Sequence, residues 1–304
     1  MRFAQLAGAF ASVTSLTTAS ALVPRQSATQ IADLGGWVEG MAVRSNGHLL
    51  LNRLDTPELW TINPSTKEAS KVLSFTGALG LTGITEISPD IFAVVTGDFN
   101  ATSFELGEGS YAVYTVDFTA ATPTPTLVKE VPESEFFIGL AAFNNDTIFI
   151  ADAGNGSLYT MSISTGEYSV ALSDPKMKAP ADAFINEGIH GLKYYDGYLY
   201  FSNAFGGTLN KVKVDPDTGK IDASITEISS SLEGPEDLIV AQDGSVYVAT
   251  INGGEVLKVA ADGTSSAFAA VTSGTACAFG RTEEDKDTMY MATSSGEVFS
   301  YQES

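Results

Sequence analysis

The chain has 304 residues, of which 44% are apolar, 29 are glycine and 11 are proline. It is long enough to bury a large core, and its glycine and proline content indicates many turns. With 37 acidic and 16 basic residues it carries a net charge of −21. This charge repels nucleic acid and anionic lipid, so we expect neither as a partner. Cys277 is the only cysteine, which excludes a disulfide within the chain.

Residues 1–21 have the pattern of a secretory signal peptide. They hold one charge, Arg2, then an apolar stretch that ends in Ala19-Ser20-Ala21. We therefore expect cleavage after Ala21 and a protein that is secreted or resides in the secretory-pathway lumen. No later apolar run approaches 18 residues, so no membrane span is expected. Three glycosylation sequons lie in predicted loops, at Asn100, Asn145 and Asn155.

A short pattern then returns six times: a small or polar residue, an apolar run, a tight turn and a second apolar run. The repeated position is occupied in turn by Gly40, Gly83, Gly139, Gly191, Asp237 and Ala276, so the steps are 43, 56, 52, 46 and 39 residues. A period near 40–50 residues with about four short strands per unit is typical of propeller blades. The sequence therefore predicts an all-β, six-bladed β-propeller, with residues 22–304 forming one domain.

The strand pattern also predicts how the ring closes. Third strands are expected at residues 58–62, 111–116, 157–161, 208–214, 255–259 and 297–301. No fourth strand follows the last of these, whereas residues 28–34 have strand character and no other sheet to join. We expect this N-terminal strand to complete the last blade.

The residue before the repeated position occurs once per blade and should face the channel at one mouth. This gives a ring of Glu39, Thr82, Ile138, His190, Glu236 and Thr275. Glu39, His190 and Glu236 could hold a divalent cation through oxygen and nitrogen ligands. They could equally serve as hydrogen-bonding or acid–base groups with shifted pKa values, or cap strand ends.

Two features should surround this ring. The ends of second strands add Arg53 and Asn203 to the same rim. Residues 96–110 and 174–188 form long loops, which are the natural place for lids and specificity. Aromatic side chains gather near this rim, namely Trp37, Phe99, Phe104, Phe184 and Phe205. Phe99, Phe104 and Phe184 lie on the long loops and are the better candidates for ligand contact.

Three stretches carry a family resemblance: EGMAVRSNGHLL at 39–50, GIHGLKYYDGYLYFSN at 188–203 and TACAFGR at 275–281. They make the chain similar to the SMP-30/gluconolactonase-like six-bladed propellers over essentially its whole mature length. It most resembles a fungal secreted group that includes the hetero-Diels–Alderases of tropolone–sesquiterpenoid pathways. A shared fold does not by itself transfer a reaction.

The lactonase branch of that family implies a metal site with three ligands, and this chain differs from it at two of the three positions. There, a Glu of the first blade, an Asn of the fourth and an Asp of the fifth hold a divalent ion. Glu39 matches the first, while His190 and Glu236 stand at the other two positions. Ile138 replaces a substrate-contacting Asn, so the floor is more apolar than a sugar lactone favours.

The resemblance implies, as a first hypothesis, a secondary-metabolite enzyme that assists a hetero-Diels–Alder cycloaddition between a polyketide-derived heterodiene and a terpene alkene, without a cofactor. His190 would donate to the heterodiene oxygen, with Glu39, Glu236, Thr82, Asn203 or Arg53 assisting. Phe99, Phe104 and Phe184 would shape the pocket.

Two alternatives remain open. One is a Ca²⁺- or Zn²⁺-dependent lactonase with Glu39, His190 and Glu236 as ligands. The other is a non-catalytic secreted propeller that binds a ligand. The residues predict a small-molecule partner in either enzyme hypothesis but no oligomeric state.

Overall fold

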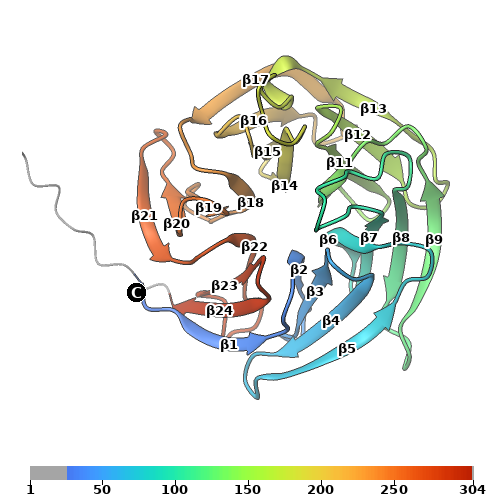
Figure 1. Ribbon diagram of the computed structural model, residues 1–304, viewed down its shortest axis with the longest axis vertical. Coiled ribbons are helices and arrows are strands. Elements are labelled where there is room, and N and C mark those ends of the chain that lie inside the picture. The colour runs from blue at the N-terminus through green and yellow to red at the C-terminus, as the bar shows by residue number, and fades with distance from the viewer. Residues whose placement is uncertain (1–25, 303–304) are drawn as a thin grey trace, which may run out of the picture.

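The computed structural model describes residues 26–302, which form six four-stranded antiparallel sheets arranged around one axis (Figure 1). This confirms the predicted all-β, six-bladed propeller. In blades 1 to 3 the strands are β2 (Val38–Val43), β3 (Leu49–Arg53), β4 (Glu58–Asn63), β5 (Glu68–Ser74), β6 (Gly80–Ser88), β7 (Ile91–Gly97), β8 (Ala112–Asp117), β9 (Thr124–Glu130), β10 (Phe137–Ala142), β11 (Thr147–Asp152), β12 (Ser157–Ser162) and β13 (Tyr168–Ser173).

Blades 4 to 6 follow the same order from the axis outward. Their strands are β14 (Ile189–Tyr195), β15 (Tyr198–Asn203), β16 (Thr208–Val214), β17 (Ile221–Ser229), β18 (Pro235–Val240), β19 (Val246–Thr250), β20 (Glu255–Val259), β21 (Ser265–Ala270), β22 (Gly274–Phe279), β23 (Thr288–Thr293) and β24 (Glu297–Gln302). The third strand of every blade begins within one residue of its predicted start.

The N-terminal strand β1 (Thr29–Asp33) completes the sixth blade, as predicted. It pairs antiparallel with β24, with Thr29 opposite Ser300 and Asp33 opposite Glu297. In Figure 1 the blue first strand therefore lies beside the red last one. The ring is closed by hydrogen bonds between the two ends of the described chain.

The repeated glycines are explained by how closely neighbouring blades approach at the axis. A Cβ on Gly40 would overlap the carbonyl oxygen of Thr82 in the next blade. The same holds for Gly83 against Ile138, and for Gly139 against His190. Each glycine thus lets the next inner strand pass close by.

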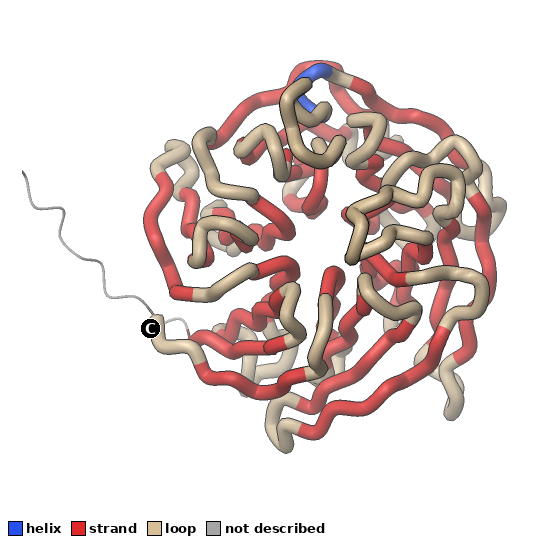
Figure 2. Tube along the Cα trace, viewed as in Figure 1, coloured by secondary structure: helices blue, strands red, loops and turns tan. Residues whose placement is uncertain are grey.

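Helix is almost absent from residues 26–302. The tube in Figure 2 shows one short helical turn, η1 (Pro175–Met177), among strands and loops. None of the helical structure described is long and apolar enough to cross a membrane. The predicted signal peptide, residues 1–21, lies outside the described residues and stays a prediction.

Candidate active site at the axis of the propeller

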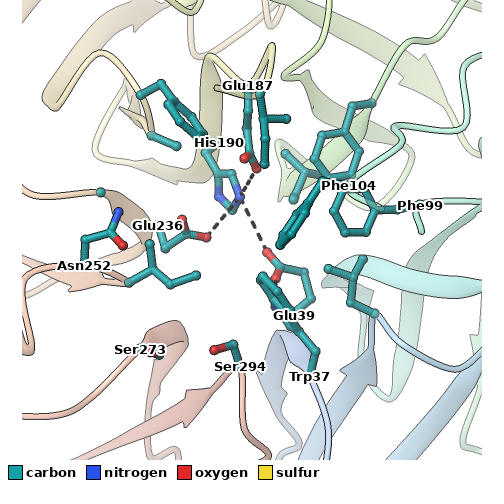
Figure 3. A pocket seen from close by; sticks show the side chains of 18 of the residues that line it. Trp37, Glu39, Phe99, Phe104, Glu187, His190, Glu236, Asn252, Ser273 and Ser294 are labelled. Atoms are coloured by element: carbon teal, nitrogen blue, oxygen red, sulfur yellow. Dashed lines mark hydrogen bonds and ion pairs between the residues drawn. The ribbon is translucent and has the colours of Figure 1, made fainter. Parts of the chain in front are cut away.

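A cavity of about 540 Å³ lies over the axis, where the inner strands begin, and all six blades contribute to its lining. Its volume is typical of sites for small molecules. The floor is polar and the wall is largely aromatic (Figure 3). The lining contains Glu39, Glu187, His190 and Glu236 but no Lys or Arg.

The floor residues sit at irregularities in the inner strands. The register of β2 shifts between Val38 and Gly40, that of β14 between Ile189 and Leu192, and that of β18 between Pro235 and Leu238. A bulge re-aims a side chain that would otherwise alternate across the sheet. The irregularity therefore turns Glu39, His190 and Glu236 toward the common axis.

His190 is the centre of the floor. Its Nε2 lies 3.1 Å from Glu236 Oε2, 3.1 Å from Glu187 Oε1 and 3.6 Å from Glu39 Oε1 (Figure 3). The side chains of His190, Glu39 and Glu236 are nearly inaccessible, and that of Glu187 is 14% exposed. One imidazole is thus shared among two buried carboxyl groups and one that is partly buried.

This arrangement shifts the pKa values of the floor residues upward. Burial by itself lowers the pKa of His190, but Glu236, Glu187 and Glu39 outweigh it and raise that pKa to about 10. Burial raises the pKa of Glu236 to about 8, although the charge of His190 opposes the shift. Burial also raises the pKa of Glu39 well above its usual range. At neutral pH the floor therefore holds an imidazolium and at least one neutral carboxylic acid.

Trp37 fixes Glu39 from the side. Its Nε1 donates a hydrogen bond of 2.7 Å to Glu39 Oε2, while the indole ring lines the cavity. Ile138, on the inner strand of the third blade, adds an apolar face to the same floor.

The aromatic wall extends from the floor to solvent. The Phe99 and Phe136 rings stack with centroids 5.0 Å apart, and Phe99 also meets Phe104 edge-on at 6.3 Å. Phe104 in turn meets Phe184 at 6.0 Å. Phe184 is 82% exposed, which places a large apolar ring at the mouth. Of the six residues predicted to contact substrate, Trp37, Phe99, Phe104, Ile138, Phe184 and Phe205, all line the cavity.

Three predicted catalytic residues lie outside the cavity lining. Thr82 is buried, and its hydroxyl donates to the Phe137 carbonyl of the next blade. Arg53 binds Asp55 at 2.7 Å and donates to the Leu34 carbonyl. The Asn203 amide donates to the carbonyls of Lys176 and Lys178. In the structure these side chains connect strands and loops and do not line the cavity.

The role predicted for His190 also changes. Its Nε2, the nitrogen aimed at the axis, is occupied by three carboxyl groups and is not free for a substrate oxygen. A neutral carboxylic acid beside it is the better donor.

Glu187 is the principal site residue that the sequence reasoning missed. It belongs to the loop 174–188, outside the repeated pattern, and so no periodicity marks it. Its separation of three residues from His190 within a predicted lid was the one available signal.

The three sequons differ in accessibility. Asn145 is exposed, whereas Asn100 and Asn155 are partly buried. The Asn155 amide donates to Asp152 Oδ2 at 2.8 Å, so a glycan there would displace a structural bond. Glycosylation remains a prediction, and Asn145 fits it best.

The floor residues fit a divalent cation in ligand type. Glu39, His190 and Glu236 each offer one ligand atom, and these atoms lie within 4.8 Å of one another. Imidazole nitrogen and carboxylate oxygen are ligands for Zn²⁺, and carboxylate oxygen is a ligand for Ca²⁺. Binding would require the protons on these groups to leave.

Comparison with known proteins agrees with the sequence resemblance. A family model described as "SMP-30/Gluconolactonase/LRE-like region" matches residues 191–295. A protein of Phoma sp. named "Putative hetero-Diels-Alderase" is 28% identical, over 84% of this chain and 83% of its own length. A relative from Sarocladium schorii with the same description is 22% identical, over 84% of this chain and 75% of its own.

A solved structure supports the same fold. The gluconolactonase of Xanthomonas campestris superposes with a TM-score of 0.67 at 13% identity, covering 91% of this chain and 89% of that one. At this identity the likeness shows the fold alone. Together with the family model and the two relatives, it confirms the predicted resemblance to the SMP-30/gluconolactonase-like propellers. Relatives named as enzymes support an enzymatic function in general.

Proposed function

We propose that the chain catalyses a hetero-Diels–Alder cycloaddition, without a cofactor, between a heterodiene of the quinone-methide type and a terpene alkene. The names of two relatives that align over 84% of the chain favour this reaction. The observation that carries the proposal is an aromatic-walled cavity whose floor holds a buried carboxylic acid with a pKa near 8.

The reaction asks little covalent work of the protein. A C=C–C=O unit and a C=C unit form one C–C bond and one C–O bond, and no atom or electron leaves the pair. Holding both partners face to face converts a bimolecular step into an intramolecular one, which can lower the barrier by several kcal/mol. The stacked wall of Phe99 and Phe136 offers a flat surface for such holding.

A neutral acid on the floor supplies the remaining assistance. Below pH 8 the Glu236 carboxyl keeps its proton and can donate it to the heterodiene oxygen. This hydrogen bond draws electron density from the heterodiene and stabilises the charge that develops on oxygen. Glu39 can act in the same way, with Trp37 holding its second oxygen.

His190 then acts as a positioning residue. Its positive charge compensates negative charge on the neighbouring carboxyl groups. Its Nε2–H orients Glu236. Without that charge, the carboxyl groups would repel one another or remain poorly solvated in the cavity.

Product analysis in the host tests the proposal. Deleting the gene should leave uncyclised polyketide and terpene precursors in place of the adduct. Such cycloadditions also proceed unaided, so the purified protein should additionally raise the rate and give one enantiomer in excess. Unchanged metabolites, together with racemic adduct at the background rate, would overturn the proposal.

Metal-dependent lactone hydrolysis is a second candidate, favoured by the ligand trio and the family model. Glu39, His190 and Glu236 would hold the cation, which would polarise the lactone carbonyl. A stoichiometric bound metal, with lactonase activity that chelation removes and the metal restores, would favour this candidate over cycloaddition.

A further inference from the structure

Building on the proposed cycloaddition, we infer that both substrates are uncharged and occupy separate sectors of the cavity. The hydrocarbon partner would lie against the wall of blades 2 to 4, and the hydroxylated heterodiene would lie over blades 5 and 6. The aromatic residues and the polar residues of the lining come from different blades, and the acidic floor lies between them (Figure 3).

The charge of the lining excludes anionic ligands. Three glutamates and one histidine face the cavity, and no lining residue is Lys or Arg. The histidine is already paired with all three carboxyl groups. A phosphate or carboxylate would enter a site with no free cation in a chain of net charge −21. A terpene partner would therefore arrive as a neutral hydrocarbon or alcohol and not as a diphosphate.

The hydrocarbon sector is defined by continuous ring contacts. Phe136, Phe99, Phe104 and Phe184 form a chain of neighbouring rings from the buried wall to the mouth. Phe104 has a left-handed backbone (φ 58°), a conformation that is costly for a bulky residue. Its amide donates to the Asn100 carbonyl at 2.7 Å, so the local turn holds the ring toward the cavity. Strain of this kind is typical of functional positions.

The polar sector offers unused hydrogen-bonding groups. Asn252, Ser273 and Ser294 line the cavity, and their side chains make no hydrogen bond to any described residue. Ser273 also has a left-handed backbone (φ 55°), and its carbonyl accepts a bond of 3.0 Å from the Ser294 amide. Two hydroxyls and an amide left free at one side of the cavity suit a ligand with several hydroxyl or carbonyl groups.

The first test compares two probes that share one C15 hydrocarbon chain and differ in the head group: farnesol has a neutral hydroxyl, and farnesyl diphosphate has a charged diphosphate. Titration calorimetry on the full-length protein should show that farnesol binds at least about tenfold more tightly than the diphosphate. Equal affinity, or tighter binding of the diphosphate, would overturn the inference of an uncharged partner.

The second test assigns each sector with half-probes. Phe104→Ala should weaken farnesol about tenfold and leave 2-hydroxybenzyl alcohol unaffected. Ser294→Ala should weaken 2-hydroxybenzyl alcohol several-fold and leave farnesol unaffected. Leu79→Ala, an exposed apolar position outside the cavity lining, is the matched control. Equal losses for both probes in both variants would refute the division into sectors.

The outcome of these binding tests can be distinguished from the outcome of the test of the proposed reaction. If the crossed pattern appears but no adduct forms, the sectors stand and the cycloaddition falls. If the adduct forms while the diphosphate binds as well as farnesol, the cycloaddition stands and the uncharged-substrate inference falls.

Discussion

The floor and the wall of the cavity are built by different parts of the chain. The floor residues Glu39, His190 and Glu236 lie on inner strands, at one equivalent position in three blades, and are almost fully buried. Phe104 and Phe184, in the wall, lie on loops outside the repeat and are 36% and 82% exposed. The repeat thus fixes where charge is held, whereas loop insertions decide what shape and polarity a ligand meets.

This difference predicts different consequences of mutation. Changes in the floor should alter both stability and chemistry, because the groups there depend on one another in a buried network. Changes in the wall should alter ligand affinity and leave folding nearly intact.

The largest effect is expected from His190→Gln. The substitution removes the one cation from three carboxyl groups, so the free energy of unfolding should fall by about 3–5 kcal/mol. Adduct formation should fall at least about 100-fold, toward the background rate. Urea unfolding and chiral product analysis measure the two effects. His48→Gln, at the other histidine, lies outside the cavity lining and should change stability by less than about 1 kcal/mol. A fully stable His190→Gln variant would contradict the network.

Glu236 should give the activity a pH dependence. Its pKa of about 8 means that the donating acid is present below pH 8 and is lost as the pH rises further. The catalysed rate should then fall about tenfold per pH unit above that value. Glu236→Gln should remove this decline at a cost of about tenfold in rate, since the amide is a weaker donor.

The matched control for this pH profile is Glu283→Gln, at a side chain that is 87% exposed. A wild-type profile that is flat through pH 9, or a Glu236→Gln profile identical to it, would remove Glu236 from the chemistry.

A smaller effect is expected from Phe184→Ala in the wall. Because this ring is 82% exposed, the free energy of unfolding should change by no more than about 0.5 kcal/mol. The apparent KM for the hydrocarbon partner should rise about fivefold, with kcat little changed. Steady-state kinetics beside thermal unfolding separates the two. Loss of stability without a change in KM would contradict the assignment of the wall.

A separate effect is a change of stability with pH. The folded-state pKa of Glu236 is raised, so the unfolded chain releases this proton first as the pH increases. Its stabilisation is complete below about pH 4.5 and is lost as the pH rises through about 8. The raised pKa of His190 likewise stabilises the fold at low pH, and this stabilisation is lost between about pH 6.5 and pH 10. The Tm of the wild type should therefore fall several degrees more than that of Glu236→Gln between pH 5 and pH 8. If the Tm of the wild type and that of Glu236→Gln fall in parallel over this pH range, Glu236 does not contribute to the pH dependence of stability.

The fold and the ionisable floor could be predicted because both follow from the repeat. A single position per blade identified Glu39, His190 and Glu236, and loop length pointed to Phe104 and Phe184. The six predicted contact residues all line the cavity.

Sequence alone could not place the predicted residues that lie outside the cavity lining. Thr82 donates to the Phe137 carbonyl of the next blade, and Asn203 donates to carbonyls of the loop that precedes its own blade. Arg53 likewise meets the Leu34 carbonyl through the folded chain and Asp55 through a local ion pair. Most of these partners lie on neighbouring loops or on the next blade, and the periodicity of the strands does not reveal such contacts. Glu187 was missed because its loop has no counterpart in the other blades.

Pairing of β1 with β24 has a consequence for when this protein becomes competent. Thr29 and Ser300 stand opposite each other across nearly the whole described chain, so the contact must wait for the final strand to leave the ribosome. Contacts of such long sequence separation form slowly. Every blade supplies part of the cavity lining. The protein should therefore bind its ligand only after the last blade has closed, and partly folded chains should not bind it.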